Sequence, residues 1–557
     1  MSKTSLPITM VQFNATTGDL NGNCAKIKQA YLQAAANQTA LVVSAEQSVT
    51  GYALDDLVFR RGFLDAVKKS VESLATITKD GPPLIVGAPW QIKDGTREAL
   101  INAGLLLKDG QIHDVVTKRA LPNYGPFHEE RHYSRGADYT PLDINGHKIG
   151  LAVCADLWDL HTALQFKAQG AEAIVAINAS PYEAGKIDTR LNIAKTAAQT
   201  SGLPVAYINT LGGQDELVFD GAGFALNAKG EILATQPQWQ DDISTVDLFA
   251  SAKTSAPQWS DEQLAQTYEA TVLATRDYAH KNNFKTAVIG MSGGIDSALT
   301  TAIACDALGP ENVYCYMLAH DDFTSENSLN FARESCAMNG CHYSDDLKIM
   351  APFQAMQGEL SKVWSGTNVK ETPENIQARL RMLFLFALSN EQKHLVLNTS
   401  NKSEVALGHS TFYGDTSGGF APIKDVWKLQ VYELAKWRNH NKCRIGFGVD
   451  GIAVHPEIIA RPPTPELGAG EIDLDLLPPY EVADPILKAL VEDEASVSDI
   501  MAMGFERETI CQLAYHMQKQ EFKRFQTPPG PIVSKRSFAR RERLYPITNH
   551  YYPRFYE

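Results

Sequence analysis

The sequence predicts an α/β protein with two domains. Its 557 residues are more than one simple core usually holds, since domains commonly contain about 100–200 residues. Short apolar strands alternate with amphipathic helices up to residue 248. A polar stretch at 251–259 follows, and a long helix then leads into a second strand, glycine turn and helix. We therefore predict domains at 1–250 and 266–557, joined by a linker at 251–265.

Six segments of the first domain are predicted strands because they are apolar, often β-branched, and bounded by Gly, Pro or Asn. They are residues 8–14, 40–46, 84–90, 149–156, 173–180 and 204–210. Helical periodicity predicts helices at 23–38 and 189–202, the second ending at Gly202. In the second domain, residues 262–283 are a predicted helix and residues 285–291 a predicted strand.

Composition and charge restrict the function classes. Lys and Arg total 51 and Asp and Glu 65, so the formal net charge is −14. This balance argues against a nucleic-acid binder, which needs a basic surface. The apolar runs are far shorter than the roughly 20 residues that span a bilayer, and the first residues have no signal-peptide pattern. We expect a cytoplasmic protein without membrane contact, whose eight cysteines, lacking any CxxC pair, are reduced thiols.

A cysteine at the end of a predicted strand is the first candidate site. Taken alone, Cys154 is best explained as a buried structural cysteine. Two charged residues change that interpretation. Glu46 closes another apolar strand, where an unused carboxylate would be costly, and Lys118 precedes a loop rich in charge. A thiol nucleophile, a carboxylate base and an ammonium facing the tetrahedral oxygen form a workable set for amide hydrolysis.

Residues 5–248 resemble the carbon–nitrogen hydrolase (nitrilase) superfamily. The likeness is carried by SAEQSVTGYALDDL around Glu46, VTKRALPNYGPFHEERHYSRG around Lys118 and GLAVCADLWD around Cys154. The resemblance implies an α-β-β-α sandwich. It implies that Glu46 is the general base and acid, Lys118 the oxyanion stabiliser and Cys154 the nucleophile.

The same resemblance implies further residues of this site. Glu129 would be a supporting acid, and the blocks NASPYEAGK and NTLGGQDELVFDGAGF are similar to the branch that handles glutamine. The residues implied to bind glutamine are Tyr124, Ser180 and Lys186. The sequence departs from the family pattern at Ala155, where Glu is frequent, and at Gly223, where Ser is common.

The second candidate site is a glycine-rich turn between a predicted strand and a predicted helix. Its residues are Gly290, Met291, Ser292, Gly293, Gly294, Ile295, Asp296 and Ser297. Backbone N–H groups at a helix N-terminus bind anions, and a carboxylate beside phosphates suits Mg²⁺. No lysine follows the glycines, which excludes a Walker A motif. The run SGGIDS resembles the pyrophosphate loop of the ATP pyrophosphatase superfamily, which implies a Rossmann-like parallel-sheet domain that cleaves ATP between its α and β phosphates.

The segments from about residue 266 to the C-terminus resemble the NAD synthetase family. They are ENIQARLR, TSNKSE, YGD, PIKDVWK, RPPTPEL and EFKRFQTPPGP. The resemblance implies a ligase that amidates deamido-NAD to NAD⁺ with ammonia released from L-glutamine. ATP would be the co-substrate and Mg²⁺ the cofactor, and glutamate, AMP and pyrophosphate would be released. The resemblance also implies a homo-oligomer, either a dimer or an assembly of dimers.

The family pattern assigns roles to particular positions of this second domain. The implied further ATP contacts are Thr399, Lys428 and Thr464, the implied deamido-NAD contacts are Asn375, Arg379, Glu404 and Lys523, and the implied metal ligands are Asp296 and Glu404. The sequence departs from the pattern at His320 and Asp321 in the loop 318–328, at His409 and at Ala539.

Two alternatives remain beside this interpretation. One is another glutamine amidotransferase of the ATP pyrophosphatase type, as in asparagine or GMP synthesis, and ENIQARLR and TSNKSE argue against it. The other is a binding or scaffold protein with an inactive hydrolase domain, and the presence of Glu46, Lys118 and Cys154 argues against it. Near the C-terminus we expect a solvated basic tail formed by Arg524, Lys535, Arg536, Arg540, Arg541 and Arg543.

Overall fold

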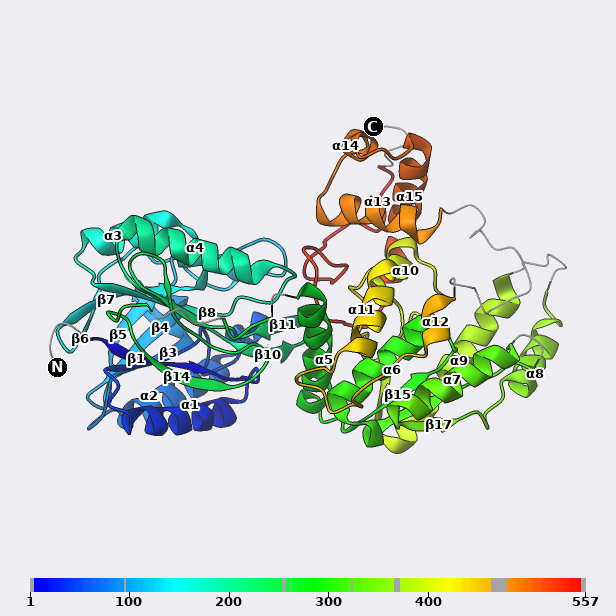
Figure 1. Ribbon diagram of the computed structural model, residues 1–557, viewed down its shortest axis with the longest axis horizontal. Coiled ribbons are helices and arrows are strands. Elements are labelled where there is room, and N and C mark those ends of the chain that lie inside the picture. The colour runs from blue at the N-terminus through cyan, green and yellow to red at the C-terminus, as the bar shows by residue number, and fades with distance from the viewer. Residues whose placement is uncertain are drawn as a thin grey trace. The chain divides into compact units, whose positions relative to one another are not determined.

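The computed structural model describes residues 5–94, 97–252, 257–260, 262–321, 324–364, 371–461 and 478–551. The chain divides into two compact units, Met1–Gln263 and Leu264–Glu557 (Figure 1). Among the described residues, every helix is too short or too polar to cross a bilayer.

The first unit contains two six-stranded sheets. The first sheet has the order β14-β1-β2-β3-β4-β5 and the second the order β13-β12-β9-β8-β7-β6. The strands of the first sheet are β1 (Pro7–Gln12), β2 (Leu41–Ser44), β3 (Leu84–Asp94), β4 (Arg97–Lys108), β5 (Gln111–Thr117) and β14 (Asp242–Asp247). Those of the second are β6 (Leu142–Ile144), β7 (His147–Val153), β8 (Ala173–Asn178), β9 (Val205–Asn209), β12 (Phe224–Leu226) and β13 (Ile232–Thr235). A separate pair, β10 (Leu211–Gln214) and β11 (Leu217–Asp220), follows β9.

Four helices cover the outer faces of these sheets. They are α1 (Leu20–Ala35), α2 (Arg61–Thr76), α3 (Leu160–Ala168) and α4 (Lys186–Ser201). Figure 1 shows α1 and α2 on one side of the strands and α3 and α4 on the other. Gly202 adopts a φ of +68° at the end of α4, the left-handed cap that the sequence predicts. The α-β-β-α sandwich is therefore confirmed.

Alternating side chains of the strands build the layers. Val43 of β2 packs into a core between the two sheets with Leu151 of β7 and Val175 of β8. Val42, its neighbour, points the other way and packs with Ile27 of α1. On the far side, Phe166 of α3 packs against the outer face of the second sheet. Each sheet thus buries both faces.

The candidate site residues follow the C-terminal ends of parallel strands in each sheet. β7, β8 and β9 are parallel neighbours, as are β1, β2 and β3. Cys154 directly follows β7, Ser180 comes just after β8, and Glu46 comes just after β2. All six strands predicted for this unit are present. The hairpin of β4 and β5 carries Lys118 at its end and was not among the predicted strands.

The second unit is built on a four-stranded parallel sheet with the order β17-β16-β15-β18. Its strands are β15 (Thr286–Gly290), β16 (Val313–Tyr316), β17 (His342–Ser344) and β18 (His394–Leu397). The predicted strand at 285–291 is β15, and the helix predicted just before it is α5 (Gln263–Lys281). The parallel-sheet class of this domain is confirmed.

Helices surround this sheet, and α6, α7 and α9 lie close to β15 in Figure 1. Apolar residues of α9 pack on the sheet, where Met382 and Leu385 join Val288 of β15. The remaining helices are α6 (Ile295–Leu308), α7 (Glu326–Asn339), α8 (Met350–Leu360), α9 (Glu371–Gln392), α10 (Lys402–Leu407), α11 (Lys428–His440), α12 (Pro456–Ala460), α13 (Tyr480–Glu492), α14 (Val497–Ala502), α15 (Arg507–Lys519) and α16 (Glu521–Arg524). A separate apolar cluster joins α10 to α13, α14 and α15.

Candidate active site

Glu46 is a buried carboxylate with every oxygen occupied. It is 1% exposed, and its Oε1 accepts hydrogen bonds from Lys118 Nζ at 2.7 Å and from Asn102 Nδ2 at 2.7 Å. Its Oε2 accepts the backbone N–H of Ala179 at 2.8 Å. Because burying an unpaired charge is costly, this full set of partners explains how a carboxylate can follow the buried strand β2.

Lys118 lies between two carboxylates. Its Nζ is 2.7 Å from Glu46 Oε1 and 2.8 Å from Glu129 Oε2. Burial works against its charge, but Glu129 and then Glu46 raise the pKa of Lys118 well above its ordinary value. Glu129 lies in a short 3₁₀ turn, Glu129–Arg131, and its Oε1 also accepts the Tyr52 hydroxyl at 2.9 Å. Burial raises the pKa of Glu129 to about 7, against the opposing effect of Lys118.

Cys154 occupies a strained turn directly after β7. Its φ is +48°, a left-handed conformation that residues other than Gly rarely adopt. Burial, and after it the charge of Glu46, raises the pKa of the Cys154 thiol, so the group is a neutral thiol near neutral pH. The backbone N–H of Ala179 hydrogen-bonds the Cys154 sulfur as well as Glu46. The thiol and the carboxylate therefore flank the same amide.

Asp156 fastens this turn to the segment that carries Lys118. Its Oδ2 accepts Val153 N at 3.0 Å and Arg119 Nη1 at 2.9 Å. Its Oδ1 accepts the backbone N–H groups of Arg119 at 2.7 Å and Ala120 at 2.8 Å. This one buried side chain therefore joins the segment of the thiol to the segment of the lysine.

The residues implied to bind glutamine surround the same strand ends. Tyr124 is 66% exposed, and its phenol interacts electrostatically with Cys154 and Lys118. Ser180 is buried, and its Oγ accepts Arg190 Nε at 3.1 Å. Lys186 is the first residue of α4, and its Nζ is 3.3 Å from a carboxylate oxygen of Glu183. A tyrosine, an ion pair and a buried serine thus accompany the cluster of Glu46, Lys118 and Cys154.

The glycine turn of the second unit is preorganised by its own hydroxyls. β15 ends at Gly290 and α6 begins at Ile295. Ser292 Oγ accepts Gly294 N at 3.1 Å and is 3.2 Å from Ser297 Oγ. Gly293 has a φ of +80°, and a Cβ added there would lie 2.5 Å from the backbone oxygen of Ser328 in α7. Only glycine fits this position, which leaves a compact turn at the N-terminus of α6.

Two carboxylates and one lysine lie beside this turn. Lys428 Nζ hydrogen-bonds Asp296 Oδ2 and lies 3.4 Å from Glu404 Oε1. Asn401 Nδ2 donates to Asp296 Oδ1 at 2.9 Å. Burial, followed by the charge of Asp296, raises the pKa of Glu404 to about 7. Lys428 is thus shared by the two carboxylates, and carboxylate oxygens are the kind of ligand that Mg²⁺ prefers.

Three of the four implied deamido-NAD contacts, all but Glu404, converge on the loop 408–412. Thr411 Oγ1 donates to Asn375 Oδ1 at 2.8 Å, and Arg379 Nε donates to Phe412 O at 3.0 Å. Lys523 Nζ donates to Gly408 O at 2.7 Å and to Ser410 O at 2.9 Å. Asn375 and Arg379 are one turn apart on α9, so one helix face and α16 meet at a single loop.

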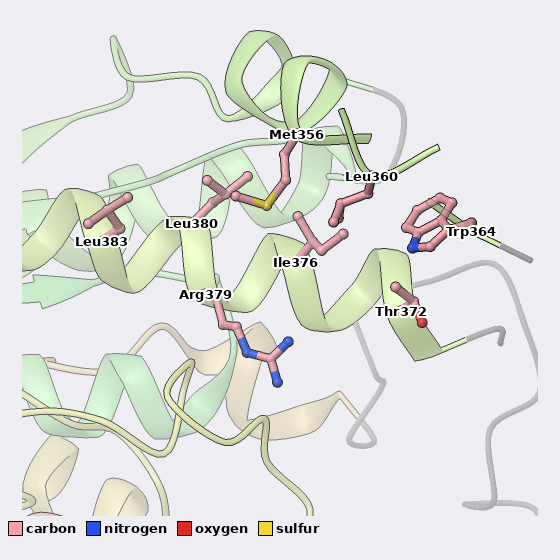
Figure 2. Close-up of a pocket in the computed structure, with 8 residues that line it drawn as sticks. All are labelled: Met356, Leu360, Trp364, Thr372, Ile376, Arg379, Leu380 and Leu383. Atoms are coloured by element: carbon pink, nitrogen blue, oxygen red, sulfur yellow. The ribbon is translucent and has the colours of Figure 1, made fainter. Parts of the chain in front are cut away.

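Arg379 also borders a cavity of about 400 Å³ beside α8 and α9. The other lining residues are Met356, Leu360, Trp364, Thr372, Ile376, Leu380 and Leu383. Figure 2 shows the apolar side chains of Met356 and Leu360 on one side of α9 and the guanidinium of Arg379 pointing away from them. The cavity is therefore mostly apolar, with one cationic group at its margin.

Two further implied ATP contacts are Thr399 and Thr464. Thr399 is half-buried in the loop after β18, beside Asn398, whose Nδ2 donates to Asp415 O at 2.6 Å. Thr464 lies outside the described residues. In the loop 318–328, where the sequence departs from the family pattern, His320 is buried. Its ring packs edge-on against Phe353 with centroids 5.1 Å apart.

The expectation of a solvated basic tail is wrong for two of its members. Arg524 is 4% exposed, with hydrogen bonds to the carbonyls of Val405 and Ala406. Arg524 and Arg543 both pair with Glu521 Oε2, at 2.7 and 2.5 Å. These arginines stabilise the packing of α16. Lys535 fits the expectation better, because its surface ion pair with Asp493 is mostly exposed.

Several residues of the site were not singled out from the sequence. Asn102, a lone polar residue within the apolar strand β4, gave a usable signal, because such a residue is costly unless it has a partner. Asn401 also gave one, as the first residue of a capping box with Glu404. Tyr52 and the buried Arg190–Asp220 ion pair, at 2.7 Å, gave no local signal.

Comparison with known proteins matches both units to families. The carbon–nitrogen hydrolase family matches residues 7–258, and the NAD synthase family matches residues 267–527. The glutamine-dependent NAD(+) synthetase of Rhodobacter capsulatus is 39% identical over 97% of this chain and 98% of its own. The structure of the glutamine-dependent NAD+ synthetase from Acinetobacter baumannii in complex with ADP is 33% identical, with a TM-score of 0.75, over 98% of this chain and 99% of that one. The corresponding enzyme from Cytophaga hutchinsonii, 19% identical with a TM-score of 0.80 over 98% of each chain, shares the fold. With its buried Glu46–Lys118–Glu129 cluster beside Cys154 and its glycine turn beside Asp296, the chain belongs to the family of glutamine-dependent NAD(+) synthetases.

Proposed function

We propose that this chain makes NAD⁺ by amidating deamido-NAD with ammonia taken from L-glutamine, at the expense of ATP. The observation that carries the proposal is the Ala179 amide, which hydrogen-bonds both the Cys154 sulfur and Glu46 while Lys118 bonds the same carboxylate. Nucleophile, base and cation are thereby in one buried cluster. Assembly into a homo-oligomer and a cytoplasmic location belong to the same proposal and rest on the family resemblance.

In the first unit, the Cys154 sulfur attacks the side-chain carbonyl carbon of glutamine as Glu46 takes the thiol proton. The raised pKa of the thiol makes such a base necessary, because little thiolate exists at rest. The Lys118 ammonium stabilises the tetrahedral oxyanion. Glu46 returns the proton to the leaving nitrogen, the C–N bond breaks, and ammonia departs. Water, deprotonated by Glu46, then hydrolyses the glutamyl thioester to glutamate.

Glutamine itself is a zwitterion, and the pair beside the cluster offers complementary charges. Lys186 would bind its α-carboxylate and Glu183 its α-ammonium, which requires the 3.3 Å ion pair between them to open. The exposed ring of Tyr124 would cover the substrate chain, and Ser180, fixed by Arg190, would face the reacting end. Glu129 holds Lys118 in place and balances its charge.

In the second unit, the turn from Gly290 to Ser297, whose shape is fixed by its own serine hydroxyls, would hold the ATP phosphates at the N-terminus of α6. The nicotinate carboxylate of deamido-NAD attacks the α-phosphorus, and pyrophosphate leaves. Ammonia then attacks the adenylated carbonyl and AMP leaves, which gives the amide. Asp296 and Glu404 would hold Mg²⁺, which when bound neutralises charge on the phosphates. Lys428 pairs with both carboxylates in this structure. Once Mg²⁺ balances the charge of those carboxylates, Lys428 would be able to turn toward a phosphate. Thr399 and Thr464 remain proposed as further ATP contacts.

The loop 408–412 would organise the dinucleotide site. Asn375, Arg379 and Lys523 each hydrogen-bond this loop, and their charged or amide groups suit the phosphates and carboxylate of deamido-NAD. Burial lowers the pKa of Lys523, opposed by Asp415, so an anionic ligand nearby would favour its charged form.

The test measures NAD⁺ formation from deamido-NAD, ATP and Mg²⁺, with either glutamine or ammonium as nitrogen donor. Wild type should use both donors, whereas Cys154→Ala should lose only the glutamine-driven reaction. Turnover of another acceptor in place of deamido-NAD would instead identify a different amidotransferase. Loss of both activities in Cys154→Ala would contradict the separate roles assigned to the two units.

A further inference from the structure

Four cysteines from separate elements gather in the second unit. The sulfur atoms of Cys315 in β16, Cys336 in α7 and Cys341 just before β17 all lie within 4.8 Å of one another. The Cys315 and Cys341 sulfurs are 3.9 Å apart. The Cys341 thiol also interacts with Cys305 of α6. Cys305, Cys315 and Cys336 are buried and Cys341 is half-buried.

The spacing of these sulfurs is that of metal ligands. A tetrahedral Zn²⁺ with Zn–S bonds of about 2.3 Å places its sulfur ligands roughly 3.8 Å apart. The 3.9 Å between Cys315 and Cys341 agrees with this value. A disulfide would bring the two sulfurs to about 2.05 Å, and all four cysteines are free thiols. The cluster therefore has the separation of a thiolate site, without covalent pairing.

The electrostatics of the cluster agree with this geometry. Hydrogen bonds from the thiols of Cys305, Cys315 and Cys336 lower the pKa of Cys341. Hydrogen bonding with Cys315 and Cys341, followed by burial, raises the pKa of Cys336. The thiols of the cluster are thus hydrogen-bonded to one another. A metal ion that enters such a cluster replaces the thiol protons and neutralises the resulting thiolates.

We propose that Cys315, Cys336 and Cys341, with Cys305 as the fourth ligand, bind a thiolate-preferring metal ion, Zn²⁺. The site is structural, because four protein side chains, three of them buried, supply its ligands and leave no position for a substrate. The site lies next to the glycine turn. β16 pairs with β15, which leads into the glycine turn, and α6 begins at that turn. α7, which carries Cys336, contacts the turn where Ser328 approaches Gly293. The ion would fix three elements around the phosphate loop.

The experiment uses full-length protein in a Cys154→Ala background, so that the reactive thiol of the first unit cannot bind the probe. Chelator-treated protein is titrated with Co²⁺ alone and then with Zn²⁺. We expect about one Co²⁺ per chain with the thiolate-to-cobalt charge-transfer absorption of a tetrahedral sulfur site, and its loss when Zn²⁺ displaces Co²⁺. Oxygen ligands such as Asp296 give no such absorption. Zn²⁺ should also raise the melting temperature.

Two variants and one labelling measurement make the outcome decisive. Adding Cys341→Ser should remove the absorption, whereas Cys511→Ala, a buried cysteine of α15 outside the cluster, should retain it. If Cys341→Ser does not fold, iodoacetamide labelling of the parent protein decides, because bound Zn²⁺ should protect Cys341 from alkylation. Absence of the absorption in the parent protein, its persistence in Cys341→Ser, or equal labelling of Cys341 with and without Zn²⁺ would overturn the proposal.

Discussion

Asp156→Asn should separate the positioning of the nucleophile from the rest of the chemistry. The asparagine keeps one oxygen but presents an NH₂ group to two donors, whichever way the amide is turned. In one orientation it loses Val153 N and Arg119 Nη1, and in the other the N–H groups of Arg119 and Ala120. At about 1.5–3 kcal/mol for each hydrogen bond to a charged group, the loss is about 3–6 kcal/mol. Arg119 keeps its bonds to two backbone carbonyls, which favours the lower end.

Urea unfolding followed by tryptophan fluorescence checks the stability change. A loss of about 3 kcal/mol with an m value of about 3 kcal/mol per M moves the midpoint by about 1 M. Glutamine-driven NAD⁺ formation should fall much more than ammonium-driven formation, because the turn at Cys154 shifts relative to Lys118. Asp159→Asn is the matched control, since Asp159 is exposed and only caps α3, where asparagine serves equally well. If the two variants have the same midpoint and the same donor ratio, Asp156 does not position the nucleophile.

Three further predictions concern both sites. Gly293→Ala should abolish NAD⁺ synthesis with either donor while glutamate release continues, because the alanine Cβ would lie 2.5 Å from the Ser328 backbone oxygen. An alanine variant that still makes NAD⁺ would show that the turn is not the phosphate site. Asp296→Asn should weaken Mg²⁺-dependent synthesis with either donor, measured as NAD⁺ against Mg²⁺ concentration, and an unchanged curve would remove Asp296 from the metal site. Glu129, whose pKa rises from 4.5 to about 7, should make glutamate release fall as the pH drops through 7, when Lys118 loses a counter-charge. The folded state holds this proton at a higher pH than the unfolded chain does, so Glu129 increases the free energy of unfolding as the pH falls from about 7 toward 4.5. Activity and stability should therefore change in opposite directions over this range. A Glu129→Gln variant should lose both pH dependences.

The parts of the fold that could be predicted are those that the local sequence determines. β2, β7 and β8 are apolar runs with clear boundaries, and the reactive residues Glu46 and Cys154 stand at strand ends where the pattern changes from apolar to polar. Family resemblance added Glu129, which packs against Lys118. The turn from Gly290 to Ser297 was readable because its glycines, serines and aspartate are contiguous.

What could not be predicted depends on partners distant in the sequence. Arg524 looked like a solvated cation because nothing nearby shows that it reaches the carbonyls at the end of α10. Asp156 lies two residues after Cys154, and its contacts become visible only when the Arg119 segment is placed against it. The cysteine cluster has no regular spacing, since its members come from three elements and a loop that only the folded sheet brings together.

The amide N–H of Ala179 has two hydrogen-bond acceptors, the Glu46 carboxylate and the Cys154 sulfur, whose charges change in opposite directions in the proposed reaction. In the structure Glu46 Oε2 accepts that hydrogen at 2.8 Å. In the proposed reaction the proton crosses from sulfur to carboxylate and the negative charge crosses in the other direction, so the same donor would then favour the newly formed thiolate. A fixed piece of main chain can thus follow the charge through the proton transfer by a slight change of hydrogen-bond direction, with no side chain having to rearrange.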